Sequence, residues 1–248
     1  KYSLDESEEK SINTLEVTGP SALVKIYDRM TNNFEFTVIK KHGNTKRTKI
    51  FTNKEKLLSL VRSSKANERE SAYKALFKTY EKNSGVLGEI YQNLVTQWRD
   101  ENISIRGFKS PISVRNIHNN IDDTTVETLL AVCKENAHLF HDYFIEKAKL
   151  IGMKKLRRYD LYAPISSKNI PKFTFKNATR LVLDTFHKFD PSFALYTERL
   201  FKENHIDSEI RNGKTGGAFC YTVTPKRTPY VLLNFDGMMR DVSTMAHE

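Results

Sequence analysis

The stretch Asp241-Val-Ser-Thr-Met-Ala-His-Glu248 decides how the fold of this chain is interpreted. Val242 and Met245 are spaced as on one face of a helix, and the stretch ends in the pair His247-Glu248. This pair matches the first half of the H-E-x-x-H motif, in which two His one turn apart bind Zn²⁺ and the Glu takes a proton from water. The second His of the motif is not among the 248 residues, so the pair by itself is a weak signal.

A β-hairpin is predicted directly before this helix. From Gly213 to Phe235 the sequence alternates with period two on both sides of a polar turn at 224–229. The first strand starts with two glycines, which have no side chains to keep another backbone at a distance and therefore suit pairing with an extended peptide. The alternative is a flexible start of a strand without a binding role. The candidate peptide-binding segment comprises Gly216, Gly217, Ala218 and Phe219.

Helical patterns dominate the remainder of the chain, which predicts a mainly α fold. A further short hairpin is expected at 34–51, with its turn at 41–45. The helical pattern is interrupted at 106–112, which contains Gly and Pro, and this run is the candidate boundary between two domains. Helices are expected at 5–32 with a break at Gly19-Pro20, at 53–63, 66–82, 84–101, 124–152 and 174–189, and from Asp190-Pro191 onward.

The helix expected at 124–152 is the longest of these. Thr124 and Glu127 have the spacing of a capping box, and Gly152 is expected to end the helix. The apolar residues from Val126 to Ile151 recur at helical spacing, which predicts a face that is buried in the core.

Two histidines on this helix have a spacing that some metal sites use. His138 and His141 stand three residues apart, beside Asp142. Histidines on helix surfaces are common, and no other ligand type converges there in the sequence. A surface position is therefore preferred over a metal site.

The formal charge of +10 raises the question of nucleic-acid binding. Lys and Arg are spread over helical segments that also contain many Glu, and the densest basic run, 40–49, has the composition of a polar loop between strands. A solvated surface is therefore preferred over a nucleic-acid interface. The longest apolar runs are far shorter than the roughly 20 residues that cross a bilayer, so no membrane span is expected.

The cysteines and the N-terminus bear on the cellular compartment. Cys133 and Cys220 lie in apolar surroundings, which predicts buried, reduced thiols rather than a disulfide framework. The chain begins at Lys1 and lacks the basic and apolar regions of a secretory signal. Both observations favour a cytoplasmic protein.

Four runs of sequence follow one another in an order that is more specific than any one of them. They are Tyr159-Asp160-Leu-Tyr162-Ala-Pro164, Gly213-Lys-Thr-Gly-Gly-Ala-Phe-Cys220, Pro229-Tyr-Val-Leu-Leu-Asn234 and Asp241-Val-Ser-Thr-Met-Ala-His-Glu248. In this series the chain resembles the oligoendopeptidase F group of zinc metallopeptidases, relatives of thimet oligopeptidase. The helical sequence pattern of residues 1–111, including Arg69-Glu-Ser-Ala-Tyr73, is also similar to that of the N-terminal lobe of this family. The resemblance therefore covers essentially the whole chain.

The resemblance implies a mostly helical, closed ellipsoid with a deep channel, in which a zinc-bound water attacks the scissile carbonyl of short peptides. It implies His247 as the first Zn²⁺ ligand, Glu248 as the general base, and 216–219 as the edge strand that holds the substrate backbone. Residues 1–111 would form the N-terminal helical lobe, with the hairpin at 34–51, and residues 112–248 the first part of the catalytic domain. The other ligands, and the His and Tyr expected to stabilise the oxyanion, would belong to the remaining C-terminal segment of the same protein, which is the expected partner.

The chain of 248 residues taken alone is expected to be inactive, because a catalytic zinc site normally uses three protein ligands and this chain offers His247. The main alternative is a non-catalytic fragment that retains the fold and binds peptides. A weaker alternative, suggested by the charge alone, is a helical nucleic-acid-binding module, which DNA binding over a salt series would reveal.

Overall fold

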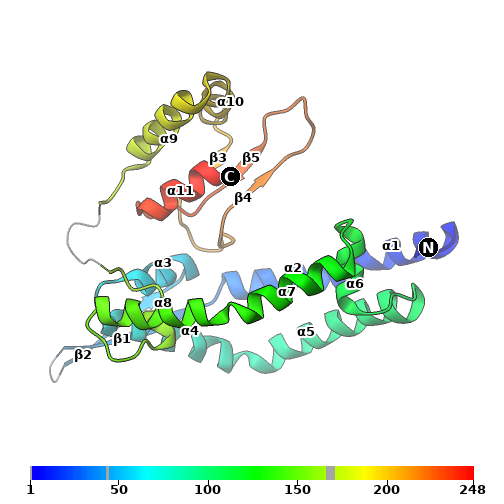
Figure 1. The fold of residues 1–248 in the computed structure, drawn as a ribbon, viewed down its shortest axis with the longest axis horizontal. Coiled ribbons are helices and arrows are strands. Elements are labelled where there is room, and N and C mark those ends of the chain that lie inside the picture. The colour runs from blue at the N-terminus through cyan, green and yellow to red at the C-terminus, as the bar shows by residue number, and fades with distance from the viewer. Residues whose placement is uncertain (1, 43–44, 166–170) are drawn as a thin grey trace. The chain divides into compact units, whose positions relative to one another are not determined.

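The computed structural model describes residues 2–42, 45–165 and 171–248. Contacts between residues divide the chain into two compact units, each made of two segments that are distant in the sequence. Unit 1 comprises residues 1–31 and 78–157, and unit 2 comprises residues 32–77 and 158–248. Figure 1 traces the elements of both units along the chain. The division at about residue 111 into a lobe and a catalytic domain stays a prediction.

Unit 1 is built from helices, and its start confirms the predicted break. The Asp5 carboxylate accepts hydrogen bonds from the backbone N–H groups of Ser7 and Glu8, which satisfies the first turn of α1. Gly19 caps the C-terminal end of α1, and α2 begins at Pro20, because the fixed φ of proline suits the first position of a helix. The elements of this part are α1 (Glu6–Thr18), α2 (Pro20–Asn32), α5 (Ser84–Arg99), the π-helical turn η2 (Asp100–Ile105), α6 (Pro111–His118), α7 (Asp123–Glu135) and α8 (Ala137–Leu150).

The prediction of one long helix at 124–152 is wrong in two respects. It is interrupted at Asn136, which ends α7 and precedes α8. The predicted capping box is also wrong, because α7 begins at Asp123 and Thr124 therefore lies inside its first turn. The Asp123 carboxylate instead accepts hydrogen bonds from Ser113 Oγ at 3.1 Å and Asn116 Nδ2 at 2.8 Å, which joins α7 to α6. Gly152 has a φ of +74°, as predicted for the residue that follows this helical stretch.

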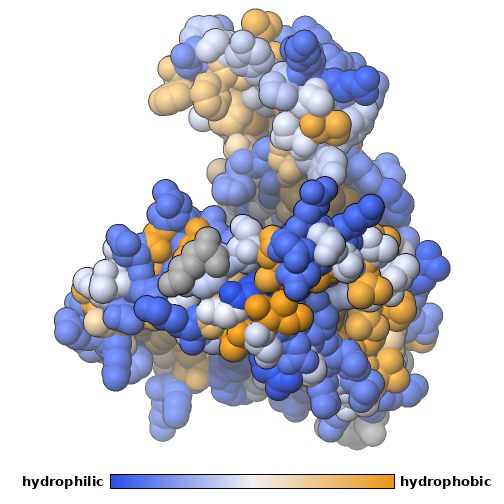
Figure 2. All heavy atoms as spheres, turned by 90° about the vertical axis from the view of Figure 1, so that its right-hand side faces the viewer, coloured by the Kyte–Doolittle hydropathy of each residue, from blue (hydrophilic) through white to orange (hydrophobic). Residues whose placement is uncertain are grey.

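The predicted buried face of this helix is also wrong. No residue of α7 is buried, and in α8 only Lys147 and Ala148 are. Leu129 is 61% exposed and Phe140 63% exposed, so the apolar stripe lies at the surface of the part of the chain that is described. Cys133 on α7 is exposed as well, which corrects its prediction as a buried thiol. Hydrophobic residues gather at the surface in the orange areas of Figure 2.

Unit 2 contains every strand of the described ranges and the helices that carry the candidate site. The β1–β2 hairpin confirms the prediction at 34–51, with Phe36 opposite Phe51 and His42 opposite Thr45; its turn residues 43 and 44 lie outside the described residues. The elements are β1 (Phe36–His42), β2 (Thr45–Phe51), α3 (Lys54–Leu58), η1 (Ser59–Arg62), α4 (Ala66–Lys82), η3 (Arg158–Asp160), α9 (Phe175–Phe189), α10 (Pro191–Lys202), β3 (Ile206–Asp207), β4 (Phe219–Tyr221), β5 (Tyr230–Leu232) and α11 (Met239–His247). Helix α4 crosses from unit 2 into unit 1 after Phe77.

The second hairpin is confirmed and carries a third strand, but the prediction that 216–219 is the edge strand is wrong for its first three residues, because β4 begins at Phe219. β4 runs antiparallel to β5, with Phe219 opposite Leu232 and Tyr221 opposite Tyr230. β3 pairs in parallel with the other edge of β5, so the order is β3-β5-β4. Within the described ranges β4 therefore has one paired edge and one open edge. Cys220 on this strand is exposed, so its prediction as a buried thiol is wrong.

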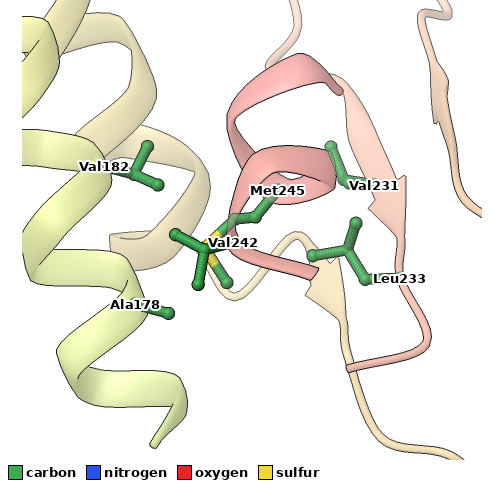
Figure 3. Packing of buried hydrophobic residues seen from close by; sticks show 6 residues of the cluster. All are labelled: Ala178, Val182, Val231, Leu233, Val242 and Met245. Carbon is green, nitrogen blue, oxygen red and sulfur yellow. The ribbon is translucent and has the colours of Figure 1, made fainter. Parts of the chain in front are cut away.

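The core of this part joins α9, β5 and α11. Ala178 and Val182 of α9 are 0% and 3% exposed, and Figure 3 shows Val242 and Met245 of α11 lying between them and the side chains from β5. Val231 and Leu233, in and directly after β5, complete the buried set. Burial of such side chains stabilises a fold by about 1.5–3 kcal/mol each. The two residues that the sequence placed on the inner face of α11 are thus confirmed as core residues.

A buried ion pair links the early and late segments of unit 2. Arg69 of α4 donates to Asp160 Oδ1 through Nε at 3.2 Å and Nη2 at 2.7 Å, and both side chains are almost fully buried. Asp160 belongs to one of the runs on which the resemblance rests. No helix in the described ranges has the length and apolar character to cross a bilayer.

Candidate active site

His247 and Glu248 lie at the end of α11, and the packing of that helix determines how they are presented. Val242 and Met245 face the core, so His247, two residues after Met245, falls on the exposed side of the last turn. The Glu248 N–H donates to Thr244 O at 3.1 Å, so helical hydrogen bonding reaches the last residue. Both residues line a cavity of about 190 Å³. Its other lining residues are Phe186, Phe193, Thr197, Leu200, Phe201, Ile206, Val231, Leu233, Met245 and Ala246.

The start of α11 is fixed by one carboxylate and one glycine. Asp241 accepts hydrogen bonds from the N–H groups of Asp236 at 3.0 Å and Met238 at 2.9 Å, a favourable place for a negative charge in the first turn. Gly237 has a φ of +84°, and a Cβ there would stand 2.7 Å from Phe173 O. Only glycine tolerates both the positive φ and the close approach of Phe173 O, so the backbone turn that leads into α11 depends on Gly237.

The candidate peptide-binding segment begins before β4. Gly216, Gly217 and Ala218 precede the strand, and Phe219 is its first residue. Asn234, which follows β5, donates through Nδ2 to Thr215 O at 3.0 Å and to Gly217 O at 2.8 Å. Asn234 Oδ1 is buried and has no hydrogen-bond partner among the described residues. The two carbonyls that flank Gly216 are thus held from the side of β5.

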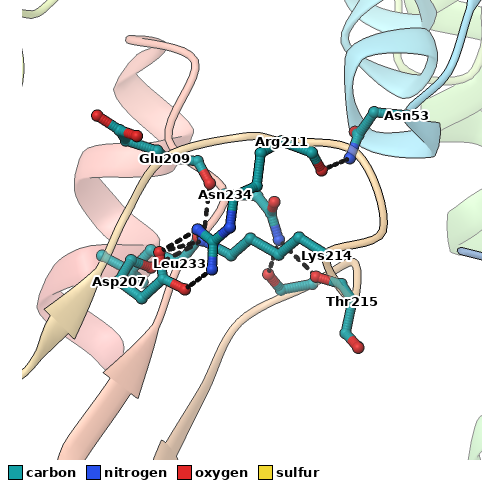
Figure 4. Close-up of polar contacts among 9 residues, drawn as sticks. Asn53, Asp207, Glu209, Arg211, Lys214, Thr215, Leu233 and Asn234 are labelled. Carbon is teal, nitrogen blue, oxygen red and sulfur yellow. Dashed lines mark hydrogen bonds and ion pairs between the residues drawn. The ribbon is translucent and has the colours of Figure 1, made fainter.

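Lys214 anchors the loop that leads into this segment. Its side chain is 2% exposed, and its Nζ lies 2.6 Å from Leu233 O, 2.8 Å from Glu209 O and 3.0 Å from both Asp207 O and Asp207 Oδ1. Arg211 donates to the two carboxylate oxygens of Asp207 at 2.6 Å each. Figure 4 shows these groups converging between β3, the loop and the end of β5. One ammonium group therefore joins three stretches of backbone and one carboxylate.

The carboxyl group of Asp207 gives this cluster a pH dependence. Hydrogen bonds from Arg211, and then from Lys214, lower the pKa of Asp207 from its ordinary value of 3.8 to about 2. A lowered folded-state pKa stabilises the fold above the unfolded value, and this stabilisation is lost as the pH falls from about 4 to about 2. We expect the free energy of unfolding to decline over this interval, and to decline less in Asp207→Asn. Denaturant titrations at several pH values compare the two slopes, and equal slopes would contradict the assignment.

The described residues contain no cluster of three or more His, Cys, Asp or Glu side chains that could hold a metal ion. His247 is suited to be a zinc ligand by type and position, but a catalytic zinc site uses three such groups. The donors in the described ranges thus do not complete a zinc site. His138 and His141 lie on α8, an element of unit 1, whereas His247 belongs to unit 2.

The structure adds residues to the candidate site that the sequence did not single out. Lys214 and Asn234 stand within runs that carry the resemblance, but period-two alternation gave no reason to select them. Asn53 and Glu55 contact the loop 211–217 from about 160 positions away. No local pattern signals such a contact, because it depends on the fold of the whole unit.

Comparison with known families now decides the classification. The family model of peptidase family M3 matches residues 59–248. The chain belongs to peptidase family M3. This membership confirms the resemblance stated from the four sequence runs, and the mainly helical fold with small sheets is confirmed with it.

Individual relatives of family M3 agree with this assignment. The chain is 26% identical over 253 residues to the oligoendopeptidase F homolog of Borreliella burgdorferi, covering 100% of this chain and 41% of that protein. It is 26% identical over 198 residues to the group B oligopeptidase PepB of Streptococcus agalactiae, covering 77% of this chain and 31% of that protein. The chain thus spans less than half the length of either relative.

A solved structure supports the fold of this family M3 chain. PZ peptidase A, crystallised with an inhibitor, superposes with a TM-score of 0.75 at 18% identity, covering 92% of this chain and 40% of the other. At this level of identity the likeness concerns the fold alone.

Proposed function

We propose that this chain contributes to a zinc-dependent endopeptidase that cleaves short oligopeptides. The observation that carries the proposal is the pair His247-Glu248, which stands at the end of a packed helix and lines a cavity in a member of family M3. The sequence runs quoted above and the names of the relatives support peptide hydrolysis as the chemistry.

Each candidate residue has a role in this proposal that follows from its chemistry. His247 is a zinc ligand, together with groups supplied by the remaining C-terminal segment of the same protein. Zinc, when bound, polarises a carbonyl and lowers the pKa of water towards ~7. Glu248 accepts and returns a proton as the general base, a role for which a partly exposed carboxylate beside a cavity is suited. Residues 216–219 hold the substrate backbone.

A proline at Ala218 tests the peptide-binding segment. It removes one backbone donor and fixes φ, at a position where the chain enters the open-edged strand β4. We expect Ala218→Pro in the full-length protein to raise KM or reduce kcat about tenfold, the effect of one lost hydrogen bond of about 1.4 kcal/mol, while thermal unfolding stays cooperative. Unchanged kinetics with several unrelated peptides would contradict a contact with substrate.

The alternative is a non-catalytic fragment that retains the fold and binds peptides. We expect the 248-residue chain, purified alone, to contain far less than one zinc per chain and to cleave no peptide, because His247 by itself does not hold zinc tightly. Elemental analysis and hydrolysis of a quenched fluorescent peptide measure both. Chelator-sensitive hydrolysis by this chain would mean that further ligands, such as His205 or the His138 and His141 pair, complete the site.

Short peptide substrates and the C-terminal segment are the partners in this proposal, and the cytoplasm is its location. Cys133 and Cys220 are free and exposed, and exposed thiols persist in a reducing compartment. The Lys and Arg residues are assigned to a solvated surface rather than to nucleic-acid binding. Binding to single-stranded and duplex DNA over a salt series would test that assignment.

A further inference from the structure

The two residues that join β2 to α3, and Glu55 in the first turn of α3, contact the loop 211–217 at three points. Thr52 Oγ1 lies 2.6 Å from Asn212 Oδ1, Asn53 Nδ2 donates to Arg211 O at 2.9 Å, and Glu55 Oε1 accepts from the Gly217 N–H at 3.3 Å. All of these residues belong to unit 2. The loop 211–217 includes the first two residues of the peptide-binding segment, so these contacts support that segment in addition to those from Asn234.

Asn53 is the buried member of this group, and both ends of its amide are used. Its side-chain oxygen accepts from the N–H groups of Glu55 at 2.8 Å and Lys56 at 3.2 Å, which caps α3. Its Nδ2 donates to Arg211 O, as Figure 4 shows. The residue is 5% exposed, so water does not readily replace the lost partner if the contact is broken. The side chain of Asn53 thus both caps α3 and holds the loop 211–217.

Glu55 makes the second contact from the same turn. Its Oε1 lies beside Gly217 N, and it also occupies the space that a Cβ on Gly216 would need. Gly217 has a φ of +83°, a conformation that most other residues avoid. The glycines therefore allow the carboxylate to approach the backbone closely. The position of Glu55 follows from the cap, because Asn53 fixes the turn on which Glu55 stands.

We propose that Asn53 is a positioning residue for peptide binding: it ties α3 to Arg211 and, through Glu55, to Gly217, and so sets the backbone of the peptide-binding segment. This inference rests on the proposed function for its link to substrate. The tie between α3 and the loop 211–217 is a property of the fold and can be measured without turnover.

The test uses Asn53→Asp in the full-length protein. Aspartate keeps the oxygen that caps α3 but loses the Nδ2 donor and turns a second oxygen towards Arg211 O. We expect amide hydrogen exchange in 211–217 to accelerate about tenfold, as for the loss of one buried hydrogen bond, while the β1–β2 amides keep their protection. KM for a quenched fluorescent peptide should rise by a similar factor of about ten, with kcat unchanged within about twofold.

A matched control and a second variant separate positioning from general damage. Asn136→Asp makes the same chemical change between α7 and α8, where Asn136 Nδ2 donates to Val132 O, and should alter neither readout. Asn53→Ser also caps a helix, but its single short hydroxyl lacks the amide group that reaches Arg211 O, so it should reproduce Asn53→Asp if the aspartate variant does not fold. Glu55→Ala removes the acceptor at Gly217 and should also raise KM.

The outcomes of this test are distinct. Unchanged exchange in 211–217 would overturn the tie, and accelerated exchange with an unchanged KM would overturn its role in peptide binding. If the unmutated protein cleaves no peptide, the proposed function fails, while the exchange data still decide whether Asn53 holds the loop.

Discussion

Glu248→Gln is expected to abolish peptide hydrolysis in the full-length protein while leaving its zinc bound, whereas His247→Ala should lose metal and activity together. The reason is chemical: the amide cannot accept a proton, and removal of a general base costs about 10²–10⁴-fold in rate. A ligand contributes its nitrogen lone pair directly to the metal, so its loss lowers occupancy as well. The two residues are adjacent at the end of α11 and therefore share the same structural support.

Metal content measured beside kcat on the same preparations distinguishes these roles. Thermal unfolding of Glu248→Gln should stay close to that of the parent, because Glu248 is only partly buried and zinc stays bound, whereas His247→Ala should unfold at a lower temperature because it loses the stabilisation by bound zinc. An equal loss of zinc in both variants would refute the separate assignments. Activity that survives Glu248→Gln would place the proton transfer elsewhere.

Lys214→Met should produce the largest loss of stability. Methionine matches the length of lysine but donates nothing, so the carbonyl oxygens of Asp207, Glu209 and Leu233 lose their shared partner. The contact with Leu233 O is buried, and an unsatisfied buried group costs about 1–3 kcal/mol. The contacts with Asp207 O and Glu209 O are partly buried, and Asp207 O still accepts a hydrogen bond from the Leu233 N–H at 2.8 Å, so their loss costs less. The Asp207 carboxylate, 42% exposed, adds little because water screens it. We expect the free energy of unfolding to fall by about 2–3 kcal/mol, a sizeable share of the ~5–15 kcal/mol that stabilises a domain.

Arg211→Ala is the matched control for this substitution. Arg211 binds the same carboxylate through two hydrogen bonds, but its side chain is 55% exposed. Exposed ion pairs contribute about 0–1 kcal/mol, so the control should unfold at nearly the same denaturant concentration as the parent. Similar losses in the two variants would show that the carboxylate, and not the three carbonyls, is what Lys214 stabilises.

The elements that local patterns specify could be predicted from the sequence. The helix expected at 66–82 forms over those residues, and Thr174 and Asp190 act as N-caps of α9 and α10 through hydrogen bonds to their first turns. The predicted inner face of α11, Val242 and Met245, is buried. In each case the signal lies within a few residues of its effect: a capping side chain, a fixed proline φ, or a spacing of three to four.

Burial and long-range contacts could not be predicted in the same way. Periodicity identified an apolar stripe on α7 and α8, but whether such a stripe is covered depends on what packs against it, and within the described ranges it is exposed. The same holds for Cys133 and Cys220, whose apolar neighbours in sequence gave no information about burial in space. The hydrogen bond from Asn53 to Arg211 spans 158 positions, a separation at which no local rule applies.

That separation also sets an order of events during synthesis. A ribosome adds about 5–20 residues per second, so Arg211 is synthesised roughly 8–30 s after Asn53. Within that interval the remainder of 32–77 and all of 78–157, which belongs to unit 1, are synthesised. Unit 2 therefore completes its folding only after unit 1 has been fully translated, and until then the amide of Asn53 has no Arg211 carbonyl to which it can donate.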